Sequence, residues 1–392
     1  MKLPPLWKIK RELLRLARQA RAVPKRLMWF FLATPYHDLF LARKRKTWAG
    51  TKTGDSRKAA VYVIYPTDGL LPSHLHTLNH LIENGYRTTV VSNLPLADDD
   101  REKLLAFCQS YIERVNFGYD FGGYRDGVLS LAREFGALDR LALLNDSAWY
   151  PLPDRSNWLA DAEALGVDFA GAVSNYGTPR VLLEDFRTLK WSYKTTHPNF
   201  HYCSFALSFG PALLQSRKFL RFWRKFRLDN DKSRVVRRGE IGLTQWALSN
   251  GFSHACTCPP QELETVLNGV SDTRIAEILN RIILPEFPLG EAARQKVLAI
   301  PQDEPDWRHT ATRFILFSAT SQGTSYALPE LTTHEMNFPF LKKSPLRLSL
   351  AGSDTSLEMI AEIPGEIGKI MMDEANVLRS HRTTKYDLKR KP

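Results

Sequence analysis

Short apolar runs alternate with amphipathic stretches along the first half of the chain. The runs have the length and aliphatic content of buried strands, and the stretches between them place apolar residues at helical spacing. The pattern predicts strands at 59–65, 87–92, 111–115 and 140–144 and helices at 73–84, 98–110 and 124–135. This β-α-β alternation is typical of an α/β fold with a mostly parallel sheet covered by helices, which binds ligands at the carboxyl ends of its strands.

The second half of the chain is less regular. Its pattern predicts strands at 167–173 and 203–209 and helices at 211–226, 240–250 and near 272–283. A polar, basic tail from about residue 375 is expected to be disordered. We therefore divide the chain into a basic segment at 1–58, an α/β domain at 59–270 and a mainly helical C-terminal extension at 271–392.

Positive charge is concentrated at the N-terminus. The formal net charge is +12, but residues 1–58 hold 16 Lys and Arg against 3 Asp and Glu, which leaves 38 basic and 39 acidic side chains elsewhere. Residues 6–21 form an amphipathic pattern with a basic face, aromatic residues follow at 29–31, and a second basic cluster occupies 43–46. This combination predicts association with an anionic membrane surface.

Two other interpretations of the basic segment stay open. It could be a solvated helix packed on the body, or it could bind nucleic acid. No base-stacking aromatic platform accompanies the charge, so we expect no nucleic-acid partner. The apolar run at 27–33 is much shorter than the roughly 20 residues that a membrane-spanning helix needs. We therefore expect peripheral association and no membrane span.

Cysteine and histidine give little sign of a metal centre. Four cysteines in a chain without a recognisable signal sequence suggest a reducing compartment and no disulfide framework. His74, His76 and His80 have no carboxylate or thiol nearby in sequence to complete a ligand set, so we interpret them as ordinary helix residues. The tight spacing at 254–258 lacks a second ligand pair.

A glycine-rich stretch at 116–127 is the first candidate for chemistry. Gly118, Gly122 and Gly123 would let the backbone turn or approach a ligand closely, and the stretch leads into helical spacing. Asp120, Arg125 and Asp126 carry more charge than a plain turn requires. We therefore predict a ligand-binding loop, with a structural turn as the alternative. Neither the G-x-G-x-x-G order nor a P-loop is present, which disfavours nicotinamide and ATP chemistry.

Two carboxylates outside this loop are candidates for catalysis. Asp146 follows the predicted strand 140–144 in the sequence Asn145-Asp146-Ser147, where an α/β sheet would place a ligand for Mg²⁺ or Mn²⁺ bound to a diphosphate. A turn cap is the alternative. Glu240 is expected at a helix start, where it could act as a general base, or simply satisfy free amides of the first turn.

Three motifs in this order resemble the rhamnan synthesis protein F family of bacterial glycosyltransferases, which is similar to GT-A glycosyltransferases. They are Asn-Phe-Gly-Tyr-Asp-Phe-Gly at 116–122, Leu-Leu-Asn-Asp-Ser at 143–147 and Glu-Ile-Gly-Leu-Thr-Gln at 240–245. The segment Asn-Phe-Pro-Phe-Leu-Lys-Lys at 337–343 is a weaker match. The resemblance covers about Ala59 to Gly251.

The resemblance implies a GT-A-like fold, a nucleotide-sugar donor such as dTDP-L-rhamnose, and a cell-surface polysaccharide or lipid-linked acceptor. Asp146 would take the place of the metal-binding carboxylate, although Asn-Asp-Ser departs from the usual Asp-x-Asp. The sequence after it, Ser-Ala-Trp-Tyr-Pro, also departs from the family pattern. The donor site would be lined by Asn116, Gly118, Tyr119, Asp120, Gly122, Gly123, Arg125, Asp126 and Asn145.

These observations lead to one hypothesis. The chain is predicted to be an inverting glycosyltransferase, with Glu240 as base and Asp146 at the leaving diphosphate, at the cytoplasmic face of a bacterial inner membrane. The alternative is a non-catalytic sugar-binding or assembly subunit of polysaccharide biosynthesis that keeps the fold and lacks the chemistry.

Overall fold

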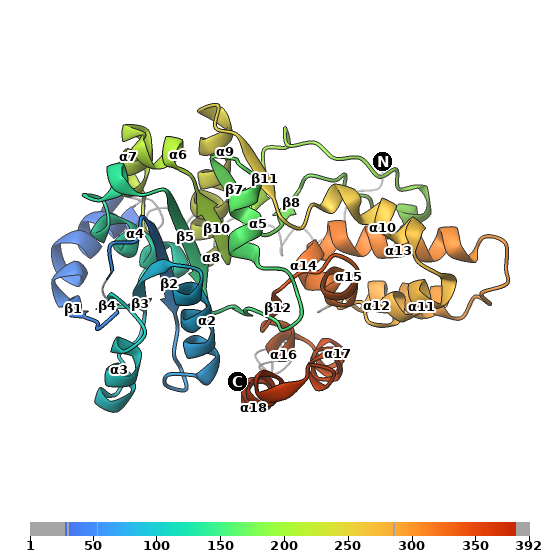
Figure 1. Cartoon of the computed structure of the whole chain (residues 1–392). Helices are drawn as coiled ribbons and strands as arrows, with labels where there is room; N and C mark the ends of the chain where they lie inside the picture. The colour runs from blue at the N-terminus through green and yellow to red at the C-terminus, as the bar shows by residue number, and fades with distance from the viewer. Residues whose placement is uncertain (1–27, 30, 53, 285–286, 382–392) are drawn as a thin grey trace, which may run out of the picture.

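The computed structural model describes residues 28–29, 31–52, 54–284 and 287–381. The predicted amphipathic helix at 6–21 lies outside these residues, and so does 382–392. In Figure 1 the sheet lies on the left, and the helical C-terminal region, in orange and red, lies to its right and below it. No helix among the described residues is both long and apolar enough to cross a membrane.

The core of the molecule is an eight-stranded sheet in the order β1-β4-β3-β2-β5-β10-β7-β11. β1 and β10 pair antiparallel with their neighbours, and the other pairings are parallel. The strands are β1 (Lys46–Ala49), β2 (Lys58–Ile64), β3 (Tyr86–Ser92), β4 (Ser110–Glu113), β5 (Arg140–Asn145), β7 (Phe169–Gly171), β10 (Ala206–Phe209) and β11 (His254–Cys256). This confirms the predicted α/β class with a mostly parallel sheet.

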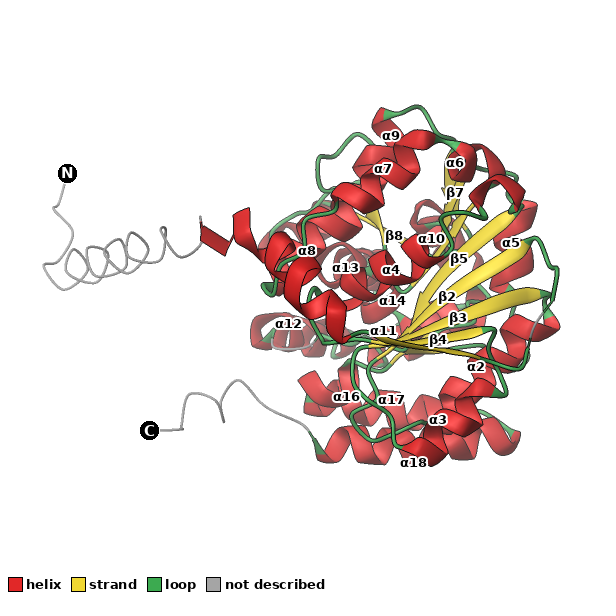
Figure 2. Ribbon diagram, turned by 90° about the vertical axis from the view of Figure 1, so that its left-hand side faces the viewer, coloured by secondary structure: helices red, strands yellow, loops and turns green. Residues whose placement is uncertain are grey.

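Helices cover both faces of the sheet because successive side chains of its central strands point to opposite sides. In β2, Val61 and Val63 belong to one apolar cluster, whereas Tyr62 and Ile64 belong to another. The first cluster lies under α4 (Tyr119–Ser130), α6 (Pro211–Gln215), α7 (Arg217–Lys225) and α9 (Gly242–Ser249). The second lies under α2 (Pro72–Glu83), α3 (Asp98–Leu105) and α5 (Trp158–Ala164). The three layers are visible in Figure 2.

Most of the glycine-rich stretch is helical, because α4 begins at Tyr119 and not at residue 124 as we predicted; only 116–118 lie in a loop. Gly118 takes a left-handed φ of 89° and α4 begins at the next residue. The later glycines allow α4 to lie close to the sheet: a Cβ on Gly123 would lie 2.8 Å from Val63 Cγ1, and one on Gly127 would lie 2.4 Å from Val61 Cγ1. Their role in the described structure is packing.

Two predicted helices also differ from the structure. The predicted helix 211–226 is divided at Ser216, whose hydroxyl caps the start of α7. The predicted helix 240–250 begins earlier, because α8 (Lys232–Val236) continues through the π-helical turn η5 (Arg237–Ile241) into α9. Glu240 therefore lies inside a helical run and not at a helix start.

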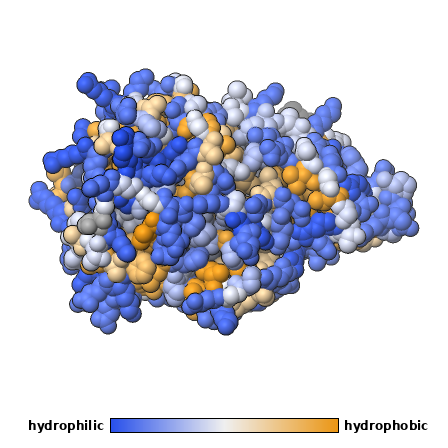
Figure 3. Space-filling model, viewed as in Figure 1, coloured by the Kyte–Doolittle hydropathy of each residue, from blue (hydrophilic) through white to orange (hydrophobic). Residues whose placement is uncertain are grey.

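The remaining short elements connect the layers. They are β6 (Ala148–Trp149), β8 (Ser174–Asn175), β9 (His201–Tyr202), β12 (Leu341–Lys342), η1 (His37–Leu41), η2 (Ala42–Lys44), η3 (Phe135–Ala137), η4 (Leu183–Thr188) and η6 (Pro260–Glu262). Residues 31–36 are helical and continue into η1. In the view of Figure 3 the surface is mainly hydrophilic, with small separate apolar patches.

The C-terminal region is helical, as predicted. Its helices are α10 (Leu263–Gly269), α11 (Asp272–Asn280), α12 (Pro288–Leu298), α13 (Trp307–Gln322), α14 (Thr324–Ala327), α15 (Pro329–Glu335), α16 (Pro345–Leu348), α17 (Leu350–Ala361) and α18 (Gly365–Ser380). α18 runs through Ser380, so disorder does not begin near residue 375. Between these helices the chain returns to the sheet domain: β12 pairs with β6, and Phe338 and Phe340 join the core beside α2.

Candidate active site

Three carboxylates predicted from separate motifs lie in one polar cluster. Asp120 is on the first turn of α4, Asp146 follows β5, and Glu240 is in η5. Loss of hydration inside the cluster, and then the negative charges of Asp146 and Glu240, raise the pKa of Asp120 to about 7. The fold therefore places the three carboxylates near enough to repel one another, and Asn145 at the end of β5 donates directly to Asp120.

Asp146 is held in its ionised form by one backbone hydrogen bond and a nearby imidazole. Its Oδ2 accepts a hydrogen bond of 2.7 Å from the backbone N–H of Tyr65, which follows β2. His74 Nε2 lies 3.4 Å from the same oxygen. Burial acts to raise the pKa of Asp146, but His74, Lys343 and the Tyr65 N–H together lower it below its ordinary value.

The tautomer of His74 follows from its other contact. The backbone N–H of Leu71 donates to His74 Nδ1 at 3.2 Å, so the ring proton of the neutral imidazole is on Nε2, facing Asp146. We interpreted His74 from the sequence as an ordinary helix residue, and this contact shows a more specific role. Its sequence signal is position alone: His74 lies in the first turn of a helix that begins at Pro72.

Glu240 is positioned by the backbone of a neighbouring segment. Its Oε1 accepts a hydrogen bond of 3.0 Å from Ser204 N and a second, short one from Ser204 Oγ. His201 Nε2 lies 3.9 Å from Oε2. From the sequence we expect Glu240 at a helix start, where free amides would be its partners. In the structure Ser204 is its partner. Glu240 lies in a π-helical turn, a feature common at functional sites, and its charge helps to raise the pKa of Asp120.

A cation from the far end of the chain completes the cluster. Lys342 Nζ donates to Ser147 Oγ at 2.9 Å and lies 4.1 Å from the centre of the Phe205 ring. Burial lowers the pKa of Lys342, and the nearby negative groups, including Glu240 and Asp120, oppose this. The sequence drew attention to the segment 337–343 but gave no role to this lysine.

The Asn145-Asp146-Ser147 turn has the hydrogen bonds of the predicted turn cap. Asn145 Oδ1 accepts from Ser147 N at 3.1 Å and from Ser147 Oγ at 2.6 Å, which is a local turn cap. Asn145 Nδ2 reaches across to Asp120 Oδ2 at 3.2 Å. The turn thus fixes its own backbone and connects two of the carboxylates.

Two residues predicted to line the donor site have structural partners instead. Arg125 donates to both carboxylate oxygens of Asp38, at 2.8 and 3.0 Å. Asp126 Oδ2 accepts from Arg114 Nε at 2.7 Å, and both side chains are buried. These ion pairs hold α4 against the N-terminal segment and the loop after β4, so we leave Arg125 and Asp126 out of the candidate site.

The other residues predicted to line the donor site are either packed in the interior or exposed at the surface. Gly122 is a packing residue, because a Cβ there would lie 2.2 Å from Phe117 O. Asn116 and Tyr119 are exposed. Gly118 N donates to Asn230 Oδ1 at 3.1 Å, which joins this edge to the loop before α8.

The cluster fits a divalent cation only if phosphate oxygens complete its ligands. Within the described residues, the one group of His, Cys, Asp and Glu spaced to hold a metal is Glu330, His334 and Glu362. Glu330 is already paired with Arg274 at 2.7 Å and Arg281 at 2.9 Å, so that group is an ion-pair network. Magnesium often uses one or two carboxylates plus substrate phosphate, and Asp146 is suited to this role.

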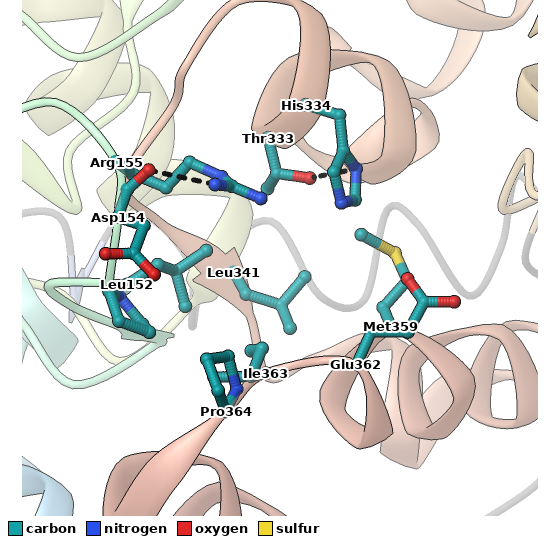
Figure 4. Close-up of a pocket in the computed structure, with 11 residues that line it drawn as sticks. Leu152, Asp154, Arg155, Thr333, His334, Leu341, Met359, Glu362, Ile363 and Pro364 are labelled. Atoms are coloured by element: carbon teal, nitrogen blue, oxygen red, sulfur yellow. Dashed lines mark hydrogen bonds between the residues drawn. The ribbon is translucent and has the colours of Figure 1, made fainter.

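A separate, mostly apolar cavity of about 250 Å³ lies between the loop after β6 and the helices α15 and α17. Figure 4 shows Leu341 and Met359 turned into it, with Thr333 and His334 at its upper side. Leu341 and Lys342 are neighbours in β12 and point to opposite faces. Strand β12 therefore separates this cavity from the carboxylate cluster.

The last described helix, α18, contacts three segments that carry residues of the site or their neighbours. Glu374 on α18 accepts from Ser73 N at 2.9 Å, Ser73 Oγ at 2.7 Å and Trp149 Nε1 at 2.9 Å, and it lies 3.4 Å from Lys343 Nζ. Burial opposes ionisation, but these partners lower the pKa of Glu374. The contact fixes the start of α2, which carries His74.

Comparison with known proteins finds matches to parts of the chain and to one relative over most of it. Residues 88–282 match the sequence profile of the family described as rhamnan synthesis protein F. An uncharacterised protein, y4gN of Sinorhizobium fredii, is 28% identical over 357 residues, which cover 86% of this chain and 83% of that protein. Virulence protein VirA of Vibrio anguillarum is 34% identical over 99 residues, 24% of this chain and 31% of that protein.

Two solved structures are also similar in part. Core-mannan synthase A of Aspergillus fumigatus, in a Mn/GDP form, matches with a TM-score of 0.25 and 8% identity. The mannosyltransferase Ktr4p of S. cerevisiae matches with a TM-score of 0.23 and 8% identity. The matches cover 45% and 46% of this chain and 65% of each of the two structures.

Proposed function

Residues 88–282 match the rhamnan synthesis protein F family of bacterial glycosyltransferases, and from this premise we propose that the chain transfers a sugar from a nucleotide donor. The observation that carries the proposal is the convergence of Asp120, Asp146 and Glu240 with Lys342 at the carboxyl ends of parallel strands. In an α/β sheet this is where ligands bind. We propose dTDP-L-rhamnose as donor and a polysaccharide or lipid-linked precursor as acceptor.

The charges of the cluster suit an inverting displacement. An acceptor hydroxyl attacks the anomeric carbon, its proton passes to a carboxylate, and the nucleoside diphosphate leaves from the opposite side of the sugar. Lys342 supplies a fixed positive charge that would stabilise the leaving diphosphate. Its hydrogen bond to Ser147 keeps the ammonium beside the turn that carries Asp146.

Glu240 is our first candidate for the base, and Asp120 is the second. Glu240 is held by Ser204 on one oxygen, so its other oxygen is available to accept a proton. Asp120, with its pKa near 7, has the acidity that favours proton transfer at neutral pH. Mutation can separate the two, because they have different partners. Asp120 accepts a hydrogen bond from Asn145, whereas Glu240 accepts one from Ser204.

A divalent cation, Mg²⁺ or Mn²⁺, is part of the proposal. When bound, it would offset charge on the diphosphate. Asp146 Oδ2 is engaged by Tyr65 and faces His74, so Asp146 Oδ1 would be its ligand. His74 and the Tyr65 N–H would keep that carboxylate oriented.

We further propose that the protein works at the cytoplasmic face of a bacterial inner membrane. The basic segment 1–58 supports this placement through its charge, and a lipid-linked acceptor would be presented there. Residues 1–27 are outside the described structure.

Release of nucleoside diphosphate from a panel of nucleotide sugars, measured by chromatography with an acceptor extract, tests the proposal. The expected result is selective release from one donor. Glu240→Gln should lower that rate by about 10²- to 10⁴-fold. Glu102→Gln, an exposed change on α3, should leave it unchanged. Donor binding without turnover in the wild type would instead indicate a non-catalytic sugar-binding subunit.

A further inference from the structure

The helical residues 28–29 and 31–41 expose an apolar face. Its exposed fractions are Met28 50%, Phe31 63%, Leu32 51%, Tyr36 42%, Leu39 54% and Phe40 58%. The opposite side is buried at Ala33 and His37, each 2% exposed. A soluble surface rarely gathers so many large apolar side chains unless something covers them.

This segment is fixed to the body of the protein. Leu228 N donates to Thr34 Oγ1 at 2.9 Å. Asp38 is paired with Arg125, and the His37 ring stacks on Phe117 with centroids 5.8 Å apart. The exposed apolar side chains are therefore presented in a fixed orientation.

Helix α7 lies beside this segment and presents cations. Its outer face carries exposed Lys218, Arg221, Arg224 and Lys225, and the helix contains no acidic residue. Among the described residues, no carboxylate lies within ion-pair distance of these four side chains. An open depression of about 610 Å³ is lined by Lys218, Arg221 and Lys225, together with Phe222 and Trp246.

The two features form one continuous face. A second depression, of about 300 Å³, is lined by Phe31, Thr34 and Pro35 from the first segment and by Arg224 and Lys225 from α7. Figure 2 shows the segment extending from the body next to α7 and α8. We call residues 28–29 and 31–41, together with α7, the basic-apolar face.

We propose that the basic-apolar face docks on an anionic lipid bilayer. The apolar side chains of 28–29 and 31–41 would enter the interfacial region, and the α7 cations would bind lipid phosphates. Both components are needed for this kind of surface binding. A second copy of the chain is a poorer occupant, because it would bring the same positive charge into the contact.

The position of this face relates it to the candidate site. The loop between α7 and α8 supplies Asn230, which accepts from Gly118 N at 3.1 Å and, through its carbonyl, from Tyr119 Oη at 3.4 Å. Docking would thus bring the bilayer next to the loop that begins α4. The inference extends the membrane association proposed above, and it does not depend on the transferase chemistry.

Vesicle co-sedimentation of the full chain tests the role of the cations, with phosphatidylcholine vesicles that contain or lack phosphatidylglycerol. The combined substitution Lys218→Glu, Arg221→Glu and Lys225→Glu should lower partitioning onto the anionic vesicles by at least about tenfold. The control combines Lys103→Glu, Lys296→Glu and Lys369→Glu, which are exposed on α3, α12 and α18 and change net charge equally. The control should stay within about twofold of wild type. Equal loss in both variants would overturn the proposal, because net charge alone would then explain binding.

A second variant tests the apolar component. Leu39→Ser with Phe40→Ser should lower partitioning several-fold at both low and high salt, whereas the α7 variant should lose affinity mainly at low salt. Wild-type binding by the serine variant would overturn the proposal. So would a wild-type dimer that this variant converts to a monomer in sedimentation velocity. Vesicle binding is measured without donor, so a failed transferase assay does not affect the result.

Discussion

Asp146 stays ionised because its neighbours stabilise the negative charge of the carboxylate. A backbone N–H from Tyr65 and the Nε2–H side of His74 both face the same oxygen. A hydrogen bond to a charged group is worth about 1.5–3 kcal/mol, and the 3.4 Å contact of His74 acts on the same charge. His74 is therefore a positioning residue whose effect reaches any ligand that Asp146 binds.

His74→Phe should weaken donor binding by about 10- to 100-fold and leave the fold intact, because the ring keeps its packing but loses both polar contacts. Isothermal titration with the preferred donor would measure this. A structural role alone would lower the unfolding midpoint without changing the dissociation constant of the folded protein, and that result would contradict the assignment.

The raised pKa of Asp120 makes stability depend on pH. The folded pKa of about 7 exceeds the ordinary value of 3.8, so the folded state favours the protonated carboxyl. Stability from this group is complete below pH 4 and is lost as pH rises toward and through 7.

Asp120→Asn should therefore stabilise the protein at pH 8, by about 1–3 kcal/mol, and should have little effect near pH 4. Urea unfolding at both pH values checks the sign. Destabilisation of the variant at pH 8 would contradict this, because it would show that the charge of Asp120 stabilises the folded protein.

At the scale of elements, α4 depends on its glycines for close packing on β2. Gly127→Ala should destabilise the protein by about 1–3 kcal/mol, because the new methyl would lie 2.4 Å from Val61 Cγ1. Gly136→Ala is the matched control, since a Cβ there meets nothing within 4 Å. Urea midpoints compare the two. Equal effects would mean that α4 has room to move away from the sheet.

The same helix shows what could and could not be predicted from sequence. Apolar periodicity located β2, α2, β3 and β5 within one or two residues, because buried strands and their covering helices have regular patterns. The glycine-rich stretch looked like a loop, since the reason for Gly123 and Gly127 lies in Val63 and Val61, more than fifty residues earlier in the chain. Local pattern does not contain that contact.

At the scale of the whole molecule, the candidate site is assembled from both ends of the chain. Asp120, Asp146 and Glu240 could be singled out from motifs, but Lys342 reaches Ser147 across a separation of 195 residues. His74 was equally hidden, because only the tertiary fold places it beside Asp146. Sequence motifs marked the charged groups, and the fold determined which of them act together.

α18 connects this assembly to global stability. Glu374→Ala should destabilise the protein by about 3–5 kcal/mol, because it leaves Lys343 and the Trp149 N–H buried without their partner. Glu366→Ala, at the exposed start of the same helix, should have almost no effect. Thermal unfolding of the two variants measures this. A small change in Glu374→Ala would mean that α18 is only loosely docked.

The measurement that tests the central claim most directly is a thermal-shift panel of nucleotide sugars, with and without Mg²⁺ or Mn²⁺. Wild type, Asp146→Ala and the exposed control Asp303→Ala would be compared. A donor at a hundredfold excess over its dissociation constant stabilises the folded state by about 2.7 kcal/mol. We predict a selective upward shift with one donor in wild type and in Asp303→Ala, and its loss in Asp146→Ala. An equal shift in all three proteins, or none with any donor, would contradict a donor site at Asp146.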